Sequence, residues 1–178
     1  MSLVIRELND GDVAAYRSLM LEAYATVPDA FTSTPEERAA EPDSWWIKRM
    51  RHPAGLGLAC GAFDGDVLVG TVALEFANKP KTRHKGLVIG MVVQEAVRGQ
   101  GAGRALMDAA LIAARARPGL RSLILTATEG NEPAIRLYRS CGFVAFGTEP
   151  LAILTPTGFR SKVHMVLDLH PNAPVPGM

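Results

Sequence analysis

Cysteine is scarce in this 178-residue chain, and neither sign of charge dominates. Only Cys60 and Cys141 are present; they form no CxxC pair, and each lies beside a glycine in apolar surroundings. This pattern favours reduced structural thiols over a disulfide and predicts a cytoplasmic protein. A formal net charge of +1 excludes a strongly basic nucleic-acid-binding protein and an acidic tail protein.

Long apolar runs and metal-ligand spacings are also missing. No stretch reaches the roughly eighteen apolar residues of a membrane helix, and the N-terminus lacks the basic lead and apolar segment of a secretory signal. The four histidines are scattered, without the spacing of a metal site. We therefore expect no membrane, no nucleic acid and no metal among the partners of this protein.

Hydrophobic residues make up 48% of the chain, a share typical of a globular domain, and they alternate between strand-like and helix-like periods. The predicted strands cover residues 3–8, 56–63, 67–76, 87–93, 122–127, 143–146 and 162–169. Helices are predicted after Asp10 and over 35–51, 101–116 and 131–140. This order predicts an α/β fold, a single three-layer domain over 1–170 with a mixed central sheet of about seven strands flanked by helices. The Pro-rich tail, 171–178, is expected to fray.

A glycine-rich turn, Arg98-Gly99-Gln100-Gly101-Ala102-Gly103-Arg104, separates a predicted buried strand from a predicted helix. Such a turn presents successive backbone N–H groups at the positive end of a helix, where a phosphate or pyrophosphate binds. The spacing fails the dinucleotide pattern G-x-G-x-x-G, because the third glycine position is Arg104 or Leu106. No Gly-Lys pair followed by a hydroxyl residue is present either, which argues against a plain nucleotide-phosphate-binding domain.

A second motif follows from Asn131 to Phe143. Asn131 is a strong N-cap residue, and Gly142 lies where a helix would end. Asn131 and Tyr138 are seven positions apart, close to two helical turns, so they share one face of the predicted helix.

Together, Arg98-x-x-Gly101-x-Gly103 and Asn131…Tyr138…Gly142-Phe143 resemble the two signatures of the GNAT superfamily of acyl-CoA N-acyltransferases. The resemblance is specific only over residues 87–146; elsewhere it rests on element order. It implies a GNAT-like N-acetyltransferase domain that uses acetyl-CoA as co-substrate and needs no metal. An acetyl group would move to a primary amine by direct attack in a ternary complex, and a homodimer stays open.

Each implied site residue matches a family position. Tyr138 corresponds to the general acid, which a phenol can serve at neutral pH. The backbone of one strand would pair with the pantetheine arm, the glycine-rich turn would hold the pyrophosphate, and the helix cap would lie beside them. The implied cofactor-binding residues are Met91, Val92, Val93, Arg98, Gly99, Gln100, Gly101, Ala102, Gly103, Arg104 and Asn131.

The general base stays open. Some relatives carry a glutamate five residues before the asparagine, where this chain has Thr126. Glu75, Glu129 and His164 are candidates by location alone. Because this glutamate is missing, a second hypothesis stays open: a non-catalytic acyl-CoA-binding sensor or interaction protein on the same fold.

The acceptor amine is not defined by the sequence. Residues 24–51 are acidic and hold Trp45 and Trp46, which would suit a cationic amine. The alternative is an amphipathic helix with one solvated face and both tryptophans in the core.

Overall fold

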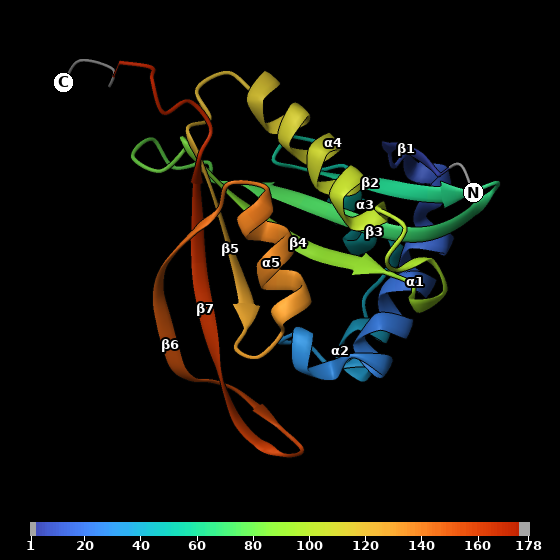
Figure 1. The fold of residues 1–178 in the computed structure, drawn as a ribbon. Helices are drawn as coiled ribbons and strands as arrows, with labels where there is room; N and C mark the ends of the chain where they lie inside the picture. Colours follow the sequence, from blue (N-terminus) through green and yellow to red (C-terminus); the bar gives the residue numbers. More distant parts are fainter. Residues whose placement is uncertain (1–2, 175–178) are drawn as a thin grey trace.

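Seven strands form one mixed sheet in the computed structural model, which describes residues 3–174 (Figure 1). Their order is β1-β2-β3-β4-β5-β7-β6, and β4 with β5 is a parallel pair in an otherwise antiparallel sheet. The strands are β1 (Val4–Glu7), β2 (Gly57–Asp64), β3 (Val67–Phe76), β4 (Lys85–Val93), β5 (Ser122–Thr128), β6 (Val144–Thr155) and β7 (Gly158–Asp168). The predicted α/β class and mixed sheet are confirmed.

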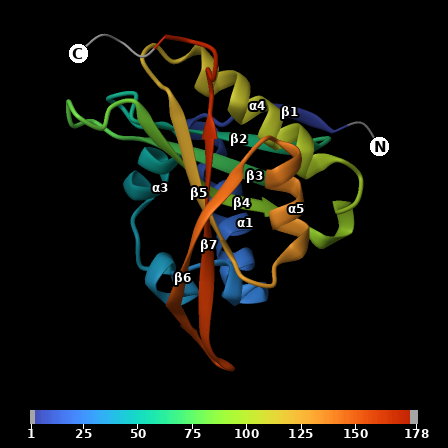
Figure 2. The same ribbon diagram turned by 60° about the vertical axis from the view of Figure 1, so that its left-hand side comes forward.

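Helices cover both faces of this sheet, which gives the predicted three layers (Figures 1 and 2). On one face lie α1 (Val13–Thr26), α2 (Pro35–Ala39) and α3 (Asp43–Met50), and on the other α4 (Ala102–Ala116) and α5 (Glu132–Ser140). Short 3-10 turns η1 (Asp10–Asp12), η2 (Pro28–Ala30) and η3 (Glu95–Val97) join them. Each layer of helices buries its own core, one around Trp46 and one around Leu106.

The predicted single helix over 35–51 is wrong, because α2 ends at Ala39 and α3 begins at Asp43. Pro42 explains the break: its ring disfavours a helical conformation at Glu41, and it has no N–H to donate. Pro42 instead serves as the extended residue that precedes α3.

The C-terminal strands are much longer than predicted. The expected strand 143–146, its loop and the strand 162–169 form one hairpin, in which β6 and β7 pair from Val144 to the turn at Pro156 and Thr157. Pro150 does not end β6, because it lies in an irregularity where the register shifts between Glu149 and Ile153. A proline without an N–H is tolerated at such a bulge on an edge strand.

The hairpin projects beyond the rest of the sheet (Figure 1). After it, residues 171–174 are exposed. Residues 175–178 of the predicted frayed tail lie outside the described residues.

β4 and β5 separate soon after they pair. Their ladder ends at Leu87 and Ile124, whereas β4 continues to pair with β3 as far as Val93. A β-bulge at Gly90 and Met91, with Gly90 at a φ of 59°, shifts the β3–β4 register at this point. Because a bulge bends its strand, β4 diverges from β5 and an opening forms in the middle of the sheet.

Candidate functional site

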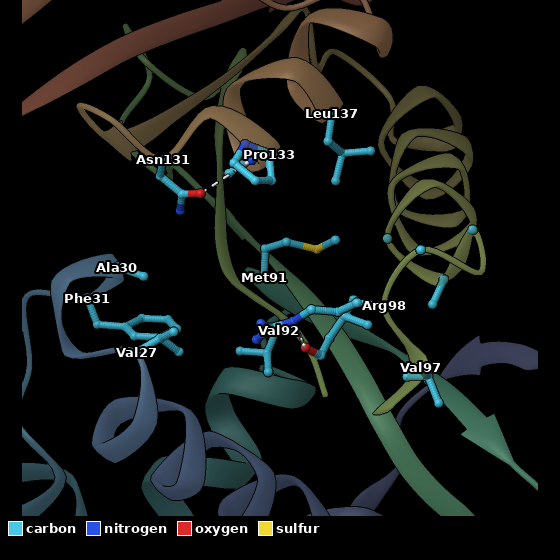
Figure 3. A pocket seen from close by; sticks show the side chains of 16 residues that line it. Val27, Ala30, Phe31, Met91, Val92, Val97, Arg98, Asn131, Pro133 and Leu137 are labelled. Atoms are coloured by element: carbon cyan, nitrogen blue, oxygen red, sulfur yellow. Dashed lines mark hydrogen bonds between the residues drawn. The ribbon is translucent and has the colours of Figure 1, made fainter. Parts of the chain in front are cut away.

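A cavity of about 390 Å³ lies at this opening (Figure 3). The end of β4, the glycine-rich turn and the facing sides of α4 and α5 form its walls, and Phe31 and its neighbours beside η2 close it from the other layer. Its volume falls in the range of small-molecule and cofactor sites. The lining residues are Val27, Ala30, Phe31, Met91, Val92, Val93, Val97, Arg98, Gly99, Gly101, Ala102, Gly103, Asn131, Pro133, Ala134 and Leu137.

The glycine-rich turn supplies unpaired amide donors. Gly99 and Gly101 have φ values of 74° and 86°, a left-handed conformation that favours glycine, and Gly101 precedes the 15-residue helix α4. Within residues 3–174, the amide N–H groups from Gly99 to Arg104 donate to no backbone or side-chain acceptor. Unpaired donors at the positive end of a helix form an anion-binding site.

The two arginines of the turn have different positions. Arg98 lines the cavity, and its Nε donates a hydrogen bond to the Val93 carbonyl at 2.9 Å, which fixes the turn to the end of β4 (Figure 3). Arg104 does not line the cavity; its Nε bonds to Asp108 Oδ1 at 2.8 Å and its Nη1 donates to the Ser140 carbonyl at 3.3 Å. Arg98 therefore supplies positive charge to the cavity, while the Arg104 side chain links α4 to α5.

Gly103 allows α4, α5 and β4 to approach closely. A Cβ atom at this position would lie 3.2 Å from Leu137 Cδ2 and 3.3 Å from Met91 Cε. Gln100 is exposed and does not line the cavity; its Nε2 donates to the Ala96 carbonyl at 3.3 Å.

The edge of β4 presents backbone to the cavity. Met91, Val92 and Val93 line it, and in the described chain β5 pairs with none of them. A free strand edge of this kind can pair with an extended ligand. The Val93 carbonyl is already engaged by Arg98, so hydrogen bonding to a ligand falls to the other groups of this edge.

Helix α5 forms the opposite wall. Asn131 caps it as predicted, because its Oδ1 accepts a hydrogen bond from the Ala134 N–H at 3.4 Å, and the Asn131 side chain lies at the cavity (Figure 3). Thr128 Oγ1, at the end of β5, donates to the Asp29 carbonyl at 2.5 Å. This bond holds η2 near the start of α5.

Tyr138 is buried in α5, with 7% of its surface exposed and its ring edge-on to Phe143 at 6.2 Å. It does not line the cavity itself but directly follows Leu137, which does. Burial raises the pKa of Tyr138 to about 12. The phenol therefore keeps its proton at neutral pH.

The acidic side chains of residues 24–51 are largely engaged. Glu37 accepts from the Thr34 N–H in a capping box at 2.8 Å, and three others lie beside arginines. These ion pairs are Asp29–Arg160 at 3.6 Å, Glu41–Arg38 at 3.6 Å and Asp43–Arg17 at 3.0 Å. The segment thus offers less free negative charge than its composition suggests.

The two tryptophans differ in environment. Trp46 is fully buried in the core, as the amphipathic interpretation predicts. Trp45 is only half-buried, and the guanidinium groups of Arg38 and Arg49 lie 4.5 Å and 5.4 Å from its ring centroids. Cations already occupy the neighbourhood of this aromatic ring, which weakens the case for a cationic acceptor there.

The candidate bases fall in three places. Glu129 is exposed just beyond β5, and Glu75 lies 3.7 Å from Arg49. His164 lies on β7 directly opposite Thr126, and its Nε2 is 2.8 Å from Glu149 Oε2. The sequence interpretation missed Glu149, because the strand that carries it was predicted as a loop. Residues 3–174 contain no group of three or more His, Cys, Asp and Glu side chains that could hold a metal ion.

The model of the acetyltransferase (GNAT) family matches residues 14–143. The chain therefore belongs to the GNAT acetyltransferase family, as its two motifs predicted. A mycothiol acetyltransferase from Geodermatophilus obscurus is 32% identical over 145 residues, which cover 78% of this chain and 44% of that protein. The chain thus spans less than half the length of that relative.

Solved structures share the fold over nearly the whole chain. A GCN5-related N-acetyltransferase from Kribbella flavida is 27% identical with a TM-score of 0.78, covering 93% of this chain and 97% of the other. The putative acetyltransferase yncA from Salmonella typhimurium, solved with its cofactor acetyl-CoA, is 20% identical with a TM-score of 0.81 over 100% of both chains. No helix in the described residues is long and apolar enough to cross a membrane.

Proposed function

We propose that this protein is an acetyl-CoA-dependent N-acetyltransferase that acetylates a primary amine by direct attack in a ternary complex. The observation that carries the proposal is the cavity at the divergence of β4 and β5, where a strand edge and a turn of amide donors find no partner within residues 3–174. A free strand edge suits the amides of a pantetheine arm, and the turn suits a pyrophosphate. Membership of the GNAT family and the fold shared with yncA, solved with acetyl-CoA, support this assignment.

Residues of the chain would hold acetyl-CoA at both ends of the cavity. The N–H groups from Gly99 to Arg104 and the Arg98 side chain would hold the pyrophosphate, and the β4 edge from Met91 to Val93 would hold the pantetheine. Asn131 bounds the cavity on the α5 side. When bound, acetyl-CoA supplies a thioester carbonyl that the amine attacks. Holding both reactants in one cavity replaces a bimolecular encounter with a positioned one.

Tyr138 is proposed as the general acid that protonates the departing sulfur. Its pKa of about 12 keeps the phenol protonated over the physiological range. Its place in α5 puts it on the helix that borders the cavity.

Replacing Tyr138 with phenylalanine tests this role. The ring and its contact with Phe143 stay, but the donor is lost, so we expect kcat to fall by about 10²- to 10⁴-fold with little change in acetyl-CoA affinity. Release of free thiol from acetyl-CoA, measured across polyamines, amino-acid derivatives and short peptides, reports kcat. Calorimetric titration reports affinity.

Tyr24→Phe is the matched control, because it removes a hydroxyl from another buried tyrosine packed on Phe31. Wild-type turnover that survives Tyr138→Phe would remove Tyr138 from the mechanism. Tight acetyl-CoA binding without transfer to any amine would instead favour the acyl-CoA-binding sensor, a function that Thr126 in place of the glutamate of some relatives already allows.

A further inference from the structure

An imidazole–carboxylate pair lies beside the position of the missing glutamate. Thr126 on β5 is the direct cross-strand partner of His164 on β7, so both side chains point to the same face of the sheet about 5 Å apart. Leu125 and Ala127, on either side of Thr126, are buried in the core with α4 and α5. Thr126 and His164 therefore face the opposite side, the side of α1 to α3.

The imidazole of His164 is held in place from β6. Its Nε2 lies 2.8 Å from Glu149 Oε2, and the ring of Phe146 packs edge-on to it at 5.9 Å. In the described part of the chain, His164 Nδ1 has no hydrogen-bond partner, and 31% of the side chain is exposed. A carboxylate that accepts the Nε2 proton leaves Nδ1 as the basic nitrogen, which is the arrangement of an oriented general base.

We propose that His164 is the general base of acetyl transfer and that Glu149 positions it; this assignment rests on the proposed function. The acceptor R-NH₃⁺ gives one proton to His164 Nδ1 and becomes R-NH₂. Its nitrogen then forms the N–C bond to the acetyl carbonyl carbon, the C–S bond breaks, and the sulfur takes the Tyr138 proton. The second proton lost by the nitrogen restores Tyr138 through water, and His164 releases its proton to solvent.

The two acidic candidates, Glu75 and Glu129, lie farther from Thr126 in the sheet. Glu75 belongs to β3, which β4 separates from β5, and its carboxylate lies beside Arg49 of α3. Glu129 lies beyond the end of β5. Neither residue is a cross-strand partner of Thr126. His164 is thus the one basic candidate that the register of the sheet places beside Thr126.

The charged groups around His164 come from three elements. On β6 the group is Glu149, and on β7 it is Lys162, whose pKa is lowered by burial. The β5 residues that face them carry no charge, and Asp29 of η2 is paired with Arg160. Among these groups, Glu149 is the one that contacts the imidazole of His164 directly, at 2.8 Å.

Three variants, assayed with one acceptor amine, test the proposal, and two of them are followed over a range of pH. His164→Gln removes the base, so we expect kcat/KM to fall by about 10²- to 10⁴-fold near neutral pH. The deficit should shrink as pH rises, because the amine then arrives neutral without help. Glu149→Gln should lower the rate less, in the same pH-dependent way, because it acts only through the imidazole. Added imidazole should partly rescue His164→Ala.

His84→Gln is the matched control, since it removes an exposed histidine from a loop in the described chain. Acetyl-CoA affinity and melting temperature, measured for every variant, separate a catalytic loss from a folding defect. Wild-type turnover together with an unchanged pH profile in His164→Gln would overturn only the assignment of the base. A pH-independent deficit without imidazole rescue would also overturn it, since a merely structural role behaves in that way. Failure of the wild-type protein to acetylate any amine would overturn the proposed function as well.

Discussion

Substitutions at Gly101 and Gly119 can distinguish a loss of anion binding at the glycine-rich turn from the cost of backbone strain. Gly101 has a φ of 86°, and Gly119, in the loop after α4, has a φ of 77°. A Cβ atom at either position would meet nothing within 4 Å. Alanine therefore introduces the same strain at both sites, roughly 1–2 kcal/mol for a left-handed residue with a side chain. Each variant should melt about 2–8 °C lower than the wild type.

Only Gly101→Ala should also weaken acetyl-CoA binding. Relaxation of the strained φ turns the neighbouring N–H groups, which stretch from Gly99 to Arg104, away from a bound pyrophosphate. A hydrogen bond to a charged group contributes about 1.5–3 kcal/mol. Since about 1.4 kcal/mol corresponds to a tenfold change in affinity, loss of one such bond weakens binding by about ten- to a hundredfold.

Isothermal titration of both variants with acetyl-CoA makes the comparison, and thermal unfolding without ligand verifies that the strain is matched. The two variants should lose similar stability and differ in affinity. If Gly101→Ala binds acetyl-CoA as tightly as Gly119→Ala does, the turn does not hold the pyrophosphate, and the assignment of the cavity fails with it.

Two further predictions concern single contacts. Asn131→Ala should lower the free energy of unfolding by about 0.5–1 kcal/mol in urea denaturation, because the cap is lost. Asn131→Asp should keep this stability but weaken acetyl-CoA binding. An acetyl-CoA affinity equal to that of the wild type in Asn131→Asp would contradict a site at the cap. Arg6, bonded to both carboxylate oxygens of Asp12 at 2.7 and 2.8 Å, lowers the pKa of Asp12 below its usual value. The ion pair therefore stabilises the fold above the usual pKa of an aspartate, and this stabilisation is lost as pH falls through the lowered pKa of Asp12. The difference in unfolding free energy between wild type and Asp12→Asn should shrink below about pH 4. A difference independent of pH would rule out this ion pair as its cause.

Elements with strong local signals could be predicted from the sequence. The glycine-rich turn, the helix after it and the cap at Asn131 each depend on residues close together in the chain. The hairpin of β6 and β7 could not be predicted, because Pro150 and Pro156 favour a loop locally. In the fold they are accommodated by a register shift and by a tight turn.

The candidate site likewise contains residues that local sequence motifs predict and contacts that only the fold reveals. Motif residues such as Gly101 and Asn131 line the cavity, and their contact with acetyl-CoA stays a prediction. The spacing of glycines did not show that Gly103 acts through close packing against Leu137 while Gly101 acts through its backbone conformation. The contact of Glu149 with His164 depends on strand register across the β6 irregularities, which has no signal in the local sequence.

The short ladder between β4 and β5 also matters for the mechanics of the domain. Among the described residues, the group β1 to β4 and the group formed by β5, β7 and β6 share register pairs only from Lys85–Ser122 to Leu87–Ile124. A pantetheine arm bonded along β4 would occupy the place of an absent strand and tie the two groups together. Co-substrate binding would then stiffen the sheet, and the slower amide hydrogen exchange that follows would extend to strands that never touch the ligand.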